Sequence, residues 1–367
     1  MQRFAVIMAG GSGERFWPAS RRARPKQLLR LTDAQLSMLE EAIARIEPLI
    51  PLENVLIATS ELLAGPIAEA IPDLPRKNVL AEPRKRNTAA CLALAAAHLE
   101  RRHGDASELA MAVLTADHKI GSPDQFRATV DAALEFATSN DALVTIGVVP
   151  TRPETGYGYI EIAHPGPRAA EPLATWPVAQ FREKPDLETA RTYAASGRHL
   201  WNSGMFFWRV STFREGLARH MPELANATDQ MVRAVGARKT DASDLAEIFE
   251  PLADVPIDIG LMEKARNVHV IRAVFPWDDV GAWDALARTR SLDADGNVVT
   301  GDAVLVDTRD SIVFNEAGEK MAVAVIGLEG IVVATTPDGV LVCRKDRAQD
   351  VRKALQEIRT RGGERFT

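Results

Sequence analysis

The strongest chemical signal in the chain is a glycine-rich stretch near its beginning, followed by basic residues. Three of the four residues at positions 10–13 are glycines, and they directly follow the apolar run at residues 4–8. Because glycine has no Cβ, its backbone N–H groups can approach a ligand closely, and successive N–H groups form a concavity that binds anions. Arg15 and Lys26 would then supply positive charge to a polyphosphate.

The spacing of these residues narrows the interpretation. The stretch contains neither the Gly-Lys-Ser/Thr sequence of a P-loop nor the G-x-G-x-x-G pattern of a dinucleotide-binding fingerprint. A plain turn after a strand is the alternative, but the basic residues favour a nucleoside triphosphate. A second polar segment, residues 115–118, follows another apolar run and contains Asp117. Ligands of open α/β sheets bind at the carboxyl ends of strands, so we expect both segments to lie in one site.

The elements that must position these residues can be read from the alternation of apolar patterns. Short strand-like runs alternate with segments of helical periodicity through the first half, which predicts an α/β fold with a Rossmann-like, mostly parallel sheet. The predicted strands are residues 3–9, 54–59, 78–81, 109–115 and 142–148. The predicted helices are residues 36–46, 61–71, 88–101 and 123–138.

The pattern changes twice further along the chain. Strands are expected at residues 156–160, 178–184 and 268–273, and helices at residues 187–196, 212–220 and 245–249. Regularly spaced short apolar runs from residue 303 to 343 predict a compact all-β unit, closed by a helix at residues 347–360. We therefore expect a catalytic domain over residues 1–290 and a β-rich domain over residues 291–367.

Composition excludes several classes of protein. The chain has 367 residues, of which 46% are hydrophobic and 26% charged, and its net charge is −6. This charge argues against a general nucleic-acid or anionic membrane surface. We find no apolar run long enough to span a bilayer and no signal peptide, so a soluble cytoplasmic protein is expected.

Six segments in order resemble the sugar-1-phosphate nucleotidyltransferase family, and within it the mannose-1-phosphate guanylyltransferase branch. The resemblance covers nearly the whole chain. The segments are residues 9–18 with Pro25-Lys26-Gln27, Glu82-Pro83 with Arg86-Asn87-Thr88, residues 181–185, residues 201–206, residues 277–283, and in the C-terminal region residues 296–299 with 346–351.

The resemblance implies the nucleotide-diphospho-sugar transferase fold, with a β-helix-like C-terminal domain. It also implies attack of a mannose 1-phosphate oxygen on the α-phosphorus of GTP, giving GDP-mannose and diphosphate. Lys26 would bridge the phosphates in the transition state, and Arg15 would hold the β- and γ-phosphates. The residues expected to contact GTP are Gly10, Gly11, Ser12, Gly13, Arg15, Glu82, Asn87 and Thr88.

A magnesium ion is the implied cofactor, with Asp117 and Asp279 as its ligands. Mg²⁺ prefers oxygen ligands, typically one or two carboxylates completed by phosphate oxygens and water. For Asp278 we leave open a role behind the metal ligand or a purely structural one. His118 is interpreted as a partner of Asp117 or a plain polar residue, because the reaction needs no proton transfer.

The sugar phosphate is expected to contact Gly158, Glu183, Lys184 and Asn202. Glu183 and Lys184 can face one ligand only if their strand bends or ends there, because successive side chains of a strand alternate. The alternatives are a surface ion pair for these two residues, a turn cap for Asn202 and a β-bulge for Gly158.

Two departures from the family and two rival functions remain. Glu14 stands where the family commonly has Thr, which adds a negative charge near the phosphates. The chain ends soon after Val351, so the isomerase activity of longer family members is not implied. The rival functions are a nucleotidyltransferase for another sugar phosphate or base, such as one that makes GDP-heptose, and a catalytically inactive regulatory relative.

We also expect a homodimer, because the short strands of the C-terminal domain leave sheet edges that need covering.

Overall fold

The computed structural model describes residues 1–163, 172–235, 242–318 and 321–367. These residues form two compact units, and each unit takes up several stretches of the chain. The first comprises Met1–Met8, Ile43–Thr115 and Ile120–Pro276; the second comprises Ala9–Ala42, Ala116–Lys119 and Trp277–Thr367. The helix α1 (Met38–Ile46) and the short strands β5 (Lys119–Ile120) and β11 (Trp277–Asp278) lie where the chain passes from one unit to the other.

A nine-stranded sheet forms the centre of the first unit, with strand order β3-β2-β1-β4-β9-β6-β10-β8-β7. Strands β8 and β9 run against the others, so the sheet is mostly parallel, as predicted. The strands are β1 (Gln2–Met8), β2 (Val55–Ser60), β3 (Val79–Glu82), β4 (Leu109–Thr115), β6 (Leu143–Val148), β7 (Gly158–Ile162), β8 (Thr175–Glu183), β9 (His199–Arg209) and β10 (Val268–Arg272).

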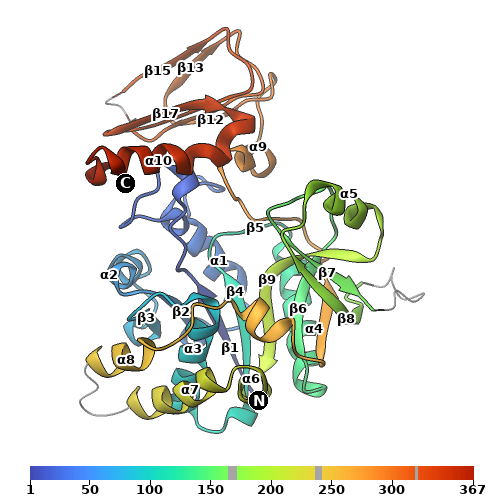
Figure 1. Cartoon of the computed structure of the whole chain (residues 1–367). Helices are drawn as coiled ribbons and strands as arrows, with labels where there is room; N and C mark the ends of the chain where they lie inside the picture. The colour runs from blue at the N-terminus through green and yellow to red at the C-terminus, as the bar shows by residue number, and fades with distance from the viewer. Residues whose placement is uncertain (164–171, 236–241, 319–320) are drawn as a thin grey trace. The chain divides into compact units, whose positions relative to one another are not determined.

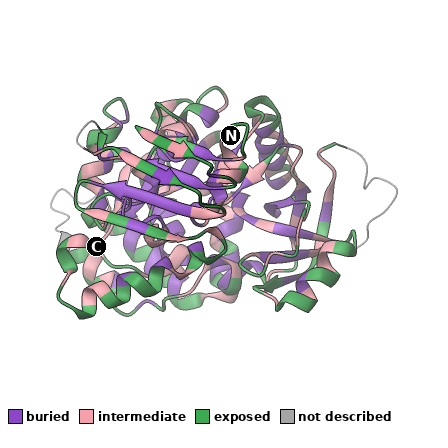
Figure 2. Cartoon of the chain, turned by 90° about the horizontal axis from the view of Figure 1, so that it is seen from above, coloured by how far each residue is buried: buried purple, intermediate pink, exposed green. Residues whose placement is uncertain are grey.

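Helices cover this sheet and complete its core (Figure 1). They are α2 (Glu61–Ala70), α3 (Asn87–His103), α4 (Pro123–Ser139), α5 (Leu187–Ala195), α6 (Val210–His220), α7 (Pro222–Ala234) and α8 (Ala242–Phe249). Alternate side chains of a strand face opposite sides, and Phe4 and Val6 of β1 share one core cluster with residues of α3, α6 and α7. Helix α4 packs against β4, β6 and β9. Figure 2 colours the chain by burial and shows buried residues in strands and in helices.

The second unit contains a β-rich part in which the first five strands alternate between two small sheets and the sixth pairs with the fifth. One sheet has the order β12-β14-β16-β17 and the other is the pair β13-β15. The strands are β12 (Val298–Thr300), β13 (Ala303–Val306), β14 (Ile312–Asn315), β15 (Val323–Ile326), β16 (Ile331–Thr336) and β17 (Gly339–Arg344). All pairings are parallel except that of β16 with β17, as expected for a β-helix-like coil.

Helix α10 (Val351–Thr360) closes this unit and lies close to β12 and β17 in Figure 1. Its apolar side chains Val351 and Leu355 share a core cluster with Phe16, Trp17 and Trp283. The same cluster takes in the short helix α9 (Leu286–Thr289) through Leu286. The segment that follows the glycine loop is therefore built into one core with the C-terminal helix. Among the described residues, no helix combines the length and apolar character needed to cross a bilayer.

Several elements differ from the sequence-based expectation. The predicted terminal helix is a 3-10 segment, Lys345–Asp350, followed by α10. Helix α7 and strand β9 were not predicted. Asn202 lies inside β9, and its Oδ1 accepts from the backbone N–H of Gly204, whose φ is a left-handed 68°, so the turn-cap contact left as an alternative is present within a strand.

Candidate functional site

The Lys26 ammonium group is buried at the centre of the first group of predicted residues, within the second unit. Its side chain is 6% exposed, and its Nζ donates to Asp117 Oδ2 at 3.0 Å and to the backbone carbonyl of Asp279 at 2.8 Å. Burial alone would raise the pKa of Asp117, but the charge of Lys26 and its hydrogen bond to the carboxylate hold it below its usual value. We call Gly13, Lys26, Asp117 and Asp279 the Lys26 cluster.

Gly13 makes the close approach of Lys26 possible. Its φ is 60°, and a Cβ at this position would lie 2.3 Å from Lys26 Cβ and 2.9 Å from Lys26 N. A Cβ added to Gly10 or Gly11 would meet no atom within 4 Å, so this part of the loop borders open space. The glycines therefore serve two purposes: Gly13 admits the lysine, and Gly10 and Gly11 leave their backbone accessible to a ligand.

The carboxylates of the Lys26 cluster fit a cation that arrives with phosphate. In the described part of the chain, no group of three or more His, Cys, Asp and Glu side chains could hold a metal ion. Magnesium in phosphoryl-transfer sites is commonly held by one or two carboxylates, the rest of its shell coming from substrate phosphates and water. Asp117 contacts Lys26 through its carboxylate and Asp279 through its backbone carbonyl, and aspartates placed in this way are suitable for such a site.

Asp278 holds the backbone next to Asp279, which fits both options left open for it. It is buried, its Oδ1 accepts from the Val280 backbone N–H at 2.8 Å, and its Oδ2 accepts from Arg288 Nε at 2.7 Å. These contacts fix the turn that carries Asp279.

His118 is positioned as a partner of Asp117. The Trp277 indole N–H donates to His118 Nδ1 at 3.2 Å. An indole nitrogen can only donate, so Nδ1 is the unprotonated nitrogen and the ring proton of the neutral tautomer is on Nε2. That nitrogen lies 3.9 Å from Asp117 Oδ1.

The two residues before Phe16 contact different partners. Arg15 Nη1 donates to the Gly281 carbonyl at 3.3 Å. Glu14, the departure from the family pattern, pairs with Arg359 of α10 at 2.8 Å. The additional negative charge is thus compensated by an arginine near the end of the chain.

A second group of predicted residues lies in the first unit and is organised by Asn202. Asn202 Nδ2 donates to Asp258 Oδ1 at 2.6 Å, while Asn202 Oδ1 accepts from the Gly204 backbone N–H at 3.1 Å. Asp258 begins the π-helical turn Asp258–Met262, and burial raises its pKa. Our sequence reasoning missed it, although a single carboxylate in the apolar run 255–262 is an uncommon residue to bury and could have marked it.

Gly158 and Glu183 are opposite each other on β7 and β8. A Cβ on Gly158 would lie 2.2 Å from Glu183 Oε1, so the glycine makes room for that carboxylate. The bulge of this ladder falls between Glu161 and Ile162, and the alternative of a bulge at Gly158 was therefore wrong. Burial, together with the charge of Asp258, raises the pKa of Glu183.

Strand β8 ends at Glu183, as the pair Glu183-Lys184 requires if both are to face one ligand. Lys184 has a left-handed φ of 45°, so the chain turns directly after the carboxylate. The charge of Lys184 acts on both Glu183 and Asp258, opposing the upward shift of their pKa values. We call Gly158, Glu183, Lys184, Asn202 and Asp258 the Asn202 cluster.

The residues predicted to read the base lie at the end of β3 and the start of α3. Burial raises the pKa of Glu82 to about 7, although a hydrogen bond with Cys91 and the charge of Lys85 oppose the shift. Helix α3 begins at Asn87, one residue before the predicted start. Thr88 Oγ1 accepts from the Ile257 backbone N–H at 2.8 Å, which ties the start of α3 to the residue before Asp258.

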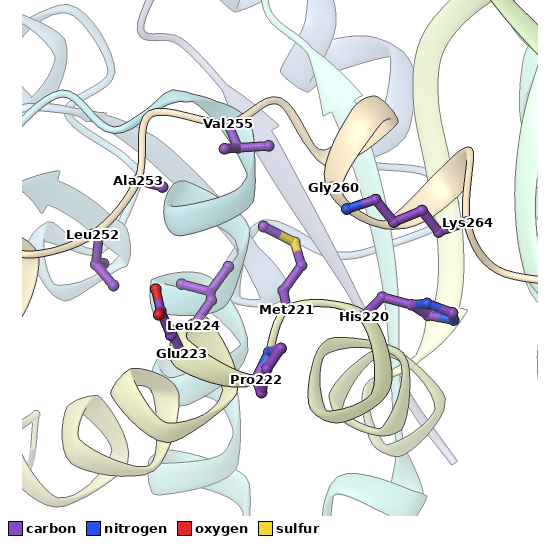
Figure 3. A pocket seen from close by; sticks show the side chains of 10 residues that line it. All are labelled: His220, Met221, Pro222, Glu223, Leu224, Leu252, Ala253, Val255, Gly260 and Lys264. Atoms are coloured by element: carbon purple, nitrogen blue, oxygen red, sulfur yellow. The ribbon is translucent and has the colours of Figure 1, made fainter.

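A cavity of about 280 Å³ between α6, α7 and residues 252–264 contains none of the predicted residues (Figure 3). Met221 lies in the middle of its lining, and a Cβ on Gly260 would come within 2.5 Å of the Met221 sulfur. Gly260 belongs to the turn that begins at Asp258, so this cavity borders the back of that turn.

Comparisons with known proteins show the family to which the chain belongs. Residues 4–296 match the family described as Nucleotidyl transferase, and residues 301–358 match the MannoseP isomerase/GMP-like beta-helix domain. The chain belongs to the nucleotidyl transferase family. This nucleotidyltransferase is 37% identical over 361 residues to a mannose-1-phosphate guanylyltransferase of Escherichia coli K12, a match that covers 98% of this chain and 74% of the relative.

Two further similarities support the same branch of the family. Mannose-1-phosphate guanylyltransferase ManC of Salmonella typhimurium is 38% identical to the nucleotidyltransferase over 361 residues, with 98% of this chain and 74% of the relative covered. A crystal structure from Thermus thermophilus, described as a mannose-1-phosphate geranyltransferase, has 36% identity and a TM-score of 0.86 and covers 98% of this chain and 100% of its own.

Proposed function

We propose that the chain is a mannose-1-phosphate guanylyltransferase, which converts GTP and α-D-mannose 1-phosphate to GDP-mannose and diphosphate. The observation that carries this proposal is the buried Lys26 ammonium, held between Asp117 and Asp279 directly beside the glycine loop. A buried cation and accessible loop amides suit the alignment and neutralisation of phosphates, and two aspartates beside the ammonium, Asp117 through its carboxylate and Asp279 through its backbone carbonyl, suit a cation bound with them. The names of the relatives supply the identity of the base and the sugar.

The reaction forms one phosphorus–oxygen bond and breaks another. An anionic oxygen of the sugar phosphate attacks the α-phosphorus, the bond from that phosphorus to the α,β-bridging oxygen breaks, and the electron pair leaves with diphosphate. No general base is needed because the nucleophile is already ionised at neutral pH. Lys26 and Arg15 neutralise the phosphates, and the amides of residues 10–13 orient them. Mg²⁺ held by Asp117 and Asp279 would supply further positive charge when bound.

The Asn202 cluster has the chemistry of a sugar phosphate subsite. Carboxylates and an amide accept and donate hydrogen bonds to hydroxyl groups, and Lys184 offers positive charge to a phosphate. Glu82, Asn87 and Thr88 are assigned to the base, since a carboxylate such as Glu82 can accept from the N1–H and amino groups of guanine.

A substrate panel tests the proposal directly. Release of diphosphate should be fastest with GTP and mannose 1-phosphate when all four nucleoside triphosphates are combined with several sugar 1-phosphates. A preference for another pair would transfer the assignment to a different sugar nucleotide, and no turnover with any pair would favour the inactive relative.

Replacement of the metal ligand tests the chemistry. Asp279→Asn should lower kcat by at least about a hundredfold, because it removes one of two carboxylates that hold the cation, while circular dichroism and the melting temperature stay close to wild type. The matched control is Asp295→Asn, a change at an exposed aspartate of the same unit, which should retain full turnover. Near-normal turnover of Asp279→Asn would contradict the metal assignment.

We also infer that the enzyme works in the cytoplasm as a homodimer. The support for a dimer is the outer face of the β13-β15 pair, where Val304, Val306 and Ile326 are 58%, 44% and 66% exposed. Contiguous exposed apolar side chains commonly mark an interface. Cell fractionation tests the compartment.

A further inference from the structure

The C-terminal helix α10 packs against the segment that follows the glycine loop. Arg359 of α10 pairs with Glu14, and Val351 and Leu355 share a core with Phe16 and Trp17. Helix and loop therefore form one assembly within the second unit, fixed by an ion pair and by buried apolar contacts.

This packing determines which face of α10 is turned toward the loop. Arg352 and Arg359 are seven residues apart, which is two turns, so they lie on one side of the helix about 10 Å apart along its axis. Because Arg359 contacts Glu14, Arg352 lies on the same side as the contact, two turns nearer the start of the helix.

Arg15 and Arg352 both have N–H donors that make no hydrogen bond within the described part of the chain. Among the described residues, Arg352 makes no hydrogen bond or ion pair, and its side chain is exposed. Arg15 donates only through Nη1 to the Gly281 carbonyl, and its Nε is buried without a partner in the described part of the chain. An unsatisfied buried guanidinium nitrogen is costly, and this cost is removed when an anion binds.

The charge of Arg352 also acts on Arg15. Burial lowers the pKa of Arg15 and the charge of Arg352 lowers it further, against the opposing charges of Asp279 and Asp284. The positive charge of Arg352 acting on Arg15, with no carboxylate shared between the two in the hydrogen bonds and ion pairs of the described residues, favours the binding of an anion beside both.

We propose that Arg352 and Arg15 together bind the terminal phosphates of the nucleoside triphosphate and the diphosphate that leaves. The inference rests on the proposed function and extends it, because Arg352 belongs to the residues that match the β-helix domain. That domain would then contribute a side chain to the chemistry. As the bond to the α-phosphorus breaks, negative charge grows on the leaving diphosphate, and a pair of planar guanidinium groups can neutralise it through several N–H donors.

Kinetics in both directions test the role of Arg352. Arg352→Gln should raise the KM for GTP and, in the reverse reaction, the KM for diphosphate by about tenfold or more, while the KM for mannose 1-phosphate stays within about twofold of wild type. Arg352→Lys should recover part of the loss. The matched control is Lys353→Gln, since this exposed neighbour on α10 pairs with Asp350 and should leave all constants unchanged. Wild-type KM values for GTP and diphosphate in Arg352→Gln would overturn the inference.

Direct binding separates this inference from the proposed function. Diphosphate alone should bind the wild-type chain in calorimetry and bind Arg352→Gln at least about tenfold more weakly, whichever sugar nucleotide the enzyme makes. Equal affinity in the two proteins would overturn the inference even if GDP-mannose is formed.

The ion pair that positions α10 provides a second test. Arg359→Gln should reproduce part of the increase in the KM for GTP, because Arg352 would lose its fixed position. The charge exchange Glu14→Arg with Arg359→Glu should restore the KM for GTP toward wild type, whereas Glu14→Arg alone should not. A charge exchange no better than the single change would contradict positioning through this pair.

Discussion

At the scale of single residues, the Lys26 cluster shows how backbone shape and charge determine each other. Gly13 has a left-handed φ and leaves the space that the Lys26 backbone fills, so the ammonium reaches Asp117 and the Asp279 carbonyl. Burying an ammonium group is costly unless it is paired, and both partners are needed to offset that cost. Gly13 of the glycine-rich stretch and Lys26 are therefore required for each other's position as well as for binding a ligand.

Glu82 gives a prediction that depends on pH. Its pKa is about 7 in the folded chain, against 4.5 for an ordinary glutamate. Folding therefore favours the neutral carboxyl of Glu82. Below pH 4.5 this carboxyl is neutral in both the folded and the unfolded chain and costs the fold nothing, whereas stability is lost as the pH rises through 7, because the buried group must then ionise. Glu82→Gln should leave the free energy of unfolding unchanged near pH 4 and raise it by up to about 3 kcal/mol at pH 8, measured by urea denaturation.

The same residue should make GTP binding pH-dependent. If the ionised carboxylate accepts from guanine, the affinity for GTP should increase from pH 6 to pH 8 in the wild-type enzyme. In Glu82→Gln the affinity should be lower and should not change over this range. An identical pH dependence in both proteins would show that another group reads the base.

At the scale of elements, clear apolar periodicity was sufficient to predict most strands of the sheet. Elements with a weaker or interrupted pattern, such as β9 and α7, were missed. The apolar run 109–115 is strand β4, and the serine and proline at 122–123 begin α4. Strand β9 was missed because Asn202-Ser203-Gly204 has the composition of a turn, although these residues lie within the strand where its pairing with β6 shifts register. Helix α7 was missed because Pro222 starts it only two residues after α6 ends.

The candidate site was predictable to a similar extent. Residues within recognisable motifs, such as Lys26 and Asp117, are brought together as expected. Asp258 could not be placed because its importance comes from a tertiary contact with Asn202, 56 residues away in sequence. Likewise, the sequence did not reveal that Glu14 would pair with Arg359, since that contact depends on how α10 packs.

The turn that begins at Asp258 yields a prediction for the sugar phosphate. Asp258→Asn replaces the charged acceptor of Asn202 Nδ2 with a neutral one and so weakens the hydrogen bond that holds the amide expected to contact the sugar. The KM for mannose 1-phosphate should rise about tenfold or more, with the KM for GTP little changed. Steady-state kinetics with one substrate saturating measures both. Asp254→Asn, at an exposed position of the same segment, is the control, and an equal effect on both KM values would indicate general damage to the fold.

At the scale of the whole molecule, the chain order mixes the two units, so neither is a simple N- or C-terminal half. The first unit holds the Asn202 cluster, and the second holds the Lys26 cluster together with the β-rich part. The segment that follows the glycine loop, which includes Phe16 and Trp17, therefore shares one hydrophobic core with the C-terminal helix α10. This is why a change in α10 is expected to affect the nucleotide, although Arg359 of α10 is 345 residues from Glu14 in sequence.

The exposed face of β13 and β15 leads to a prediction about assembly. Ile326 is 66% exposed, so Ile326→Glu should leave the fold of each chain intact but should place a charge in the proposed dimer interface. Light scattering at micromolar concentration should give a dimer for wild type and a monomer for Ile326→Glu. Val342→Glu is the matched control, because Val342 is 63% exposed but lies on β17, in the other sheet, and should leave the dimer intact. A wild-type monomer would contradict the dimer, and loss of the dimer only in Val342→Glu would move the interface to the β17 edge.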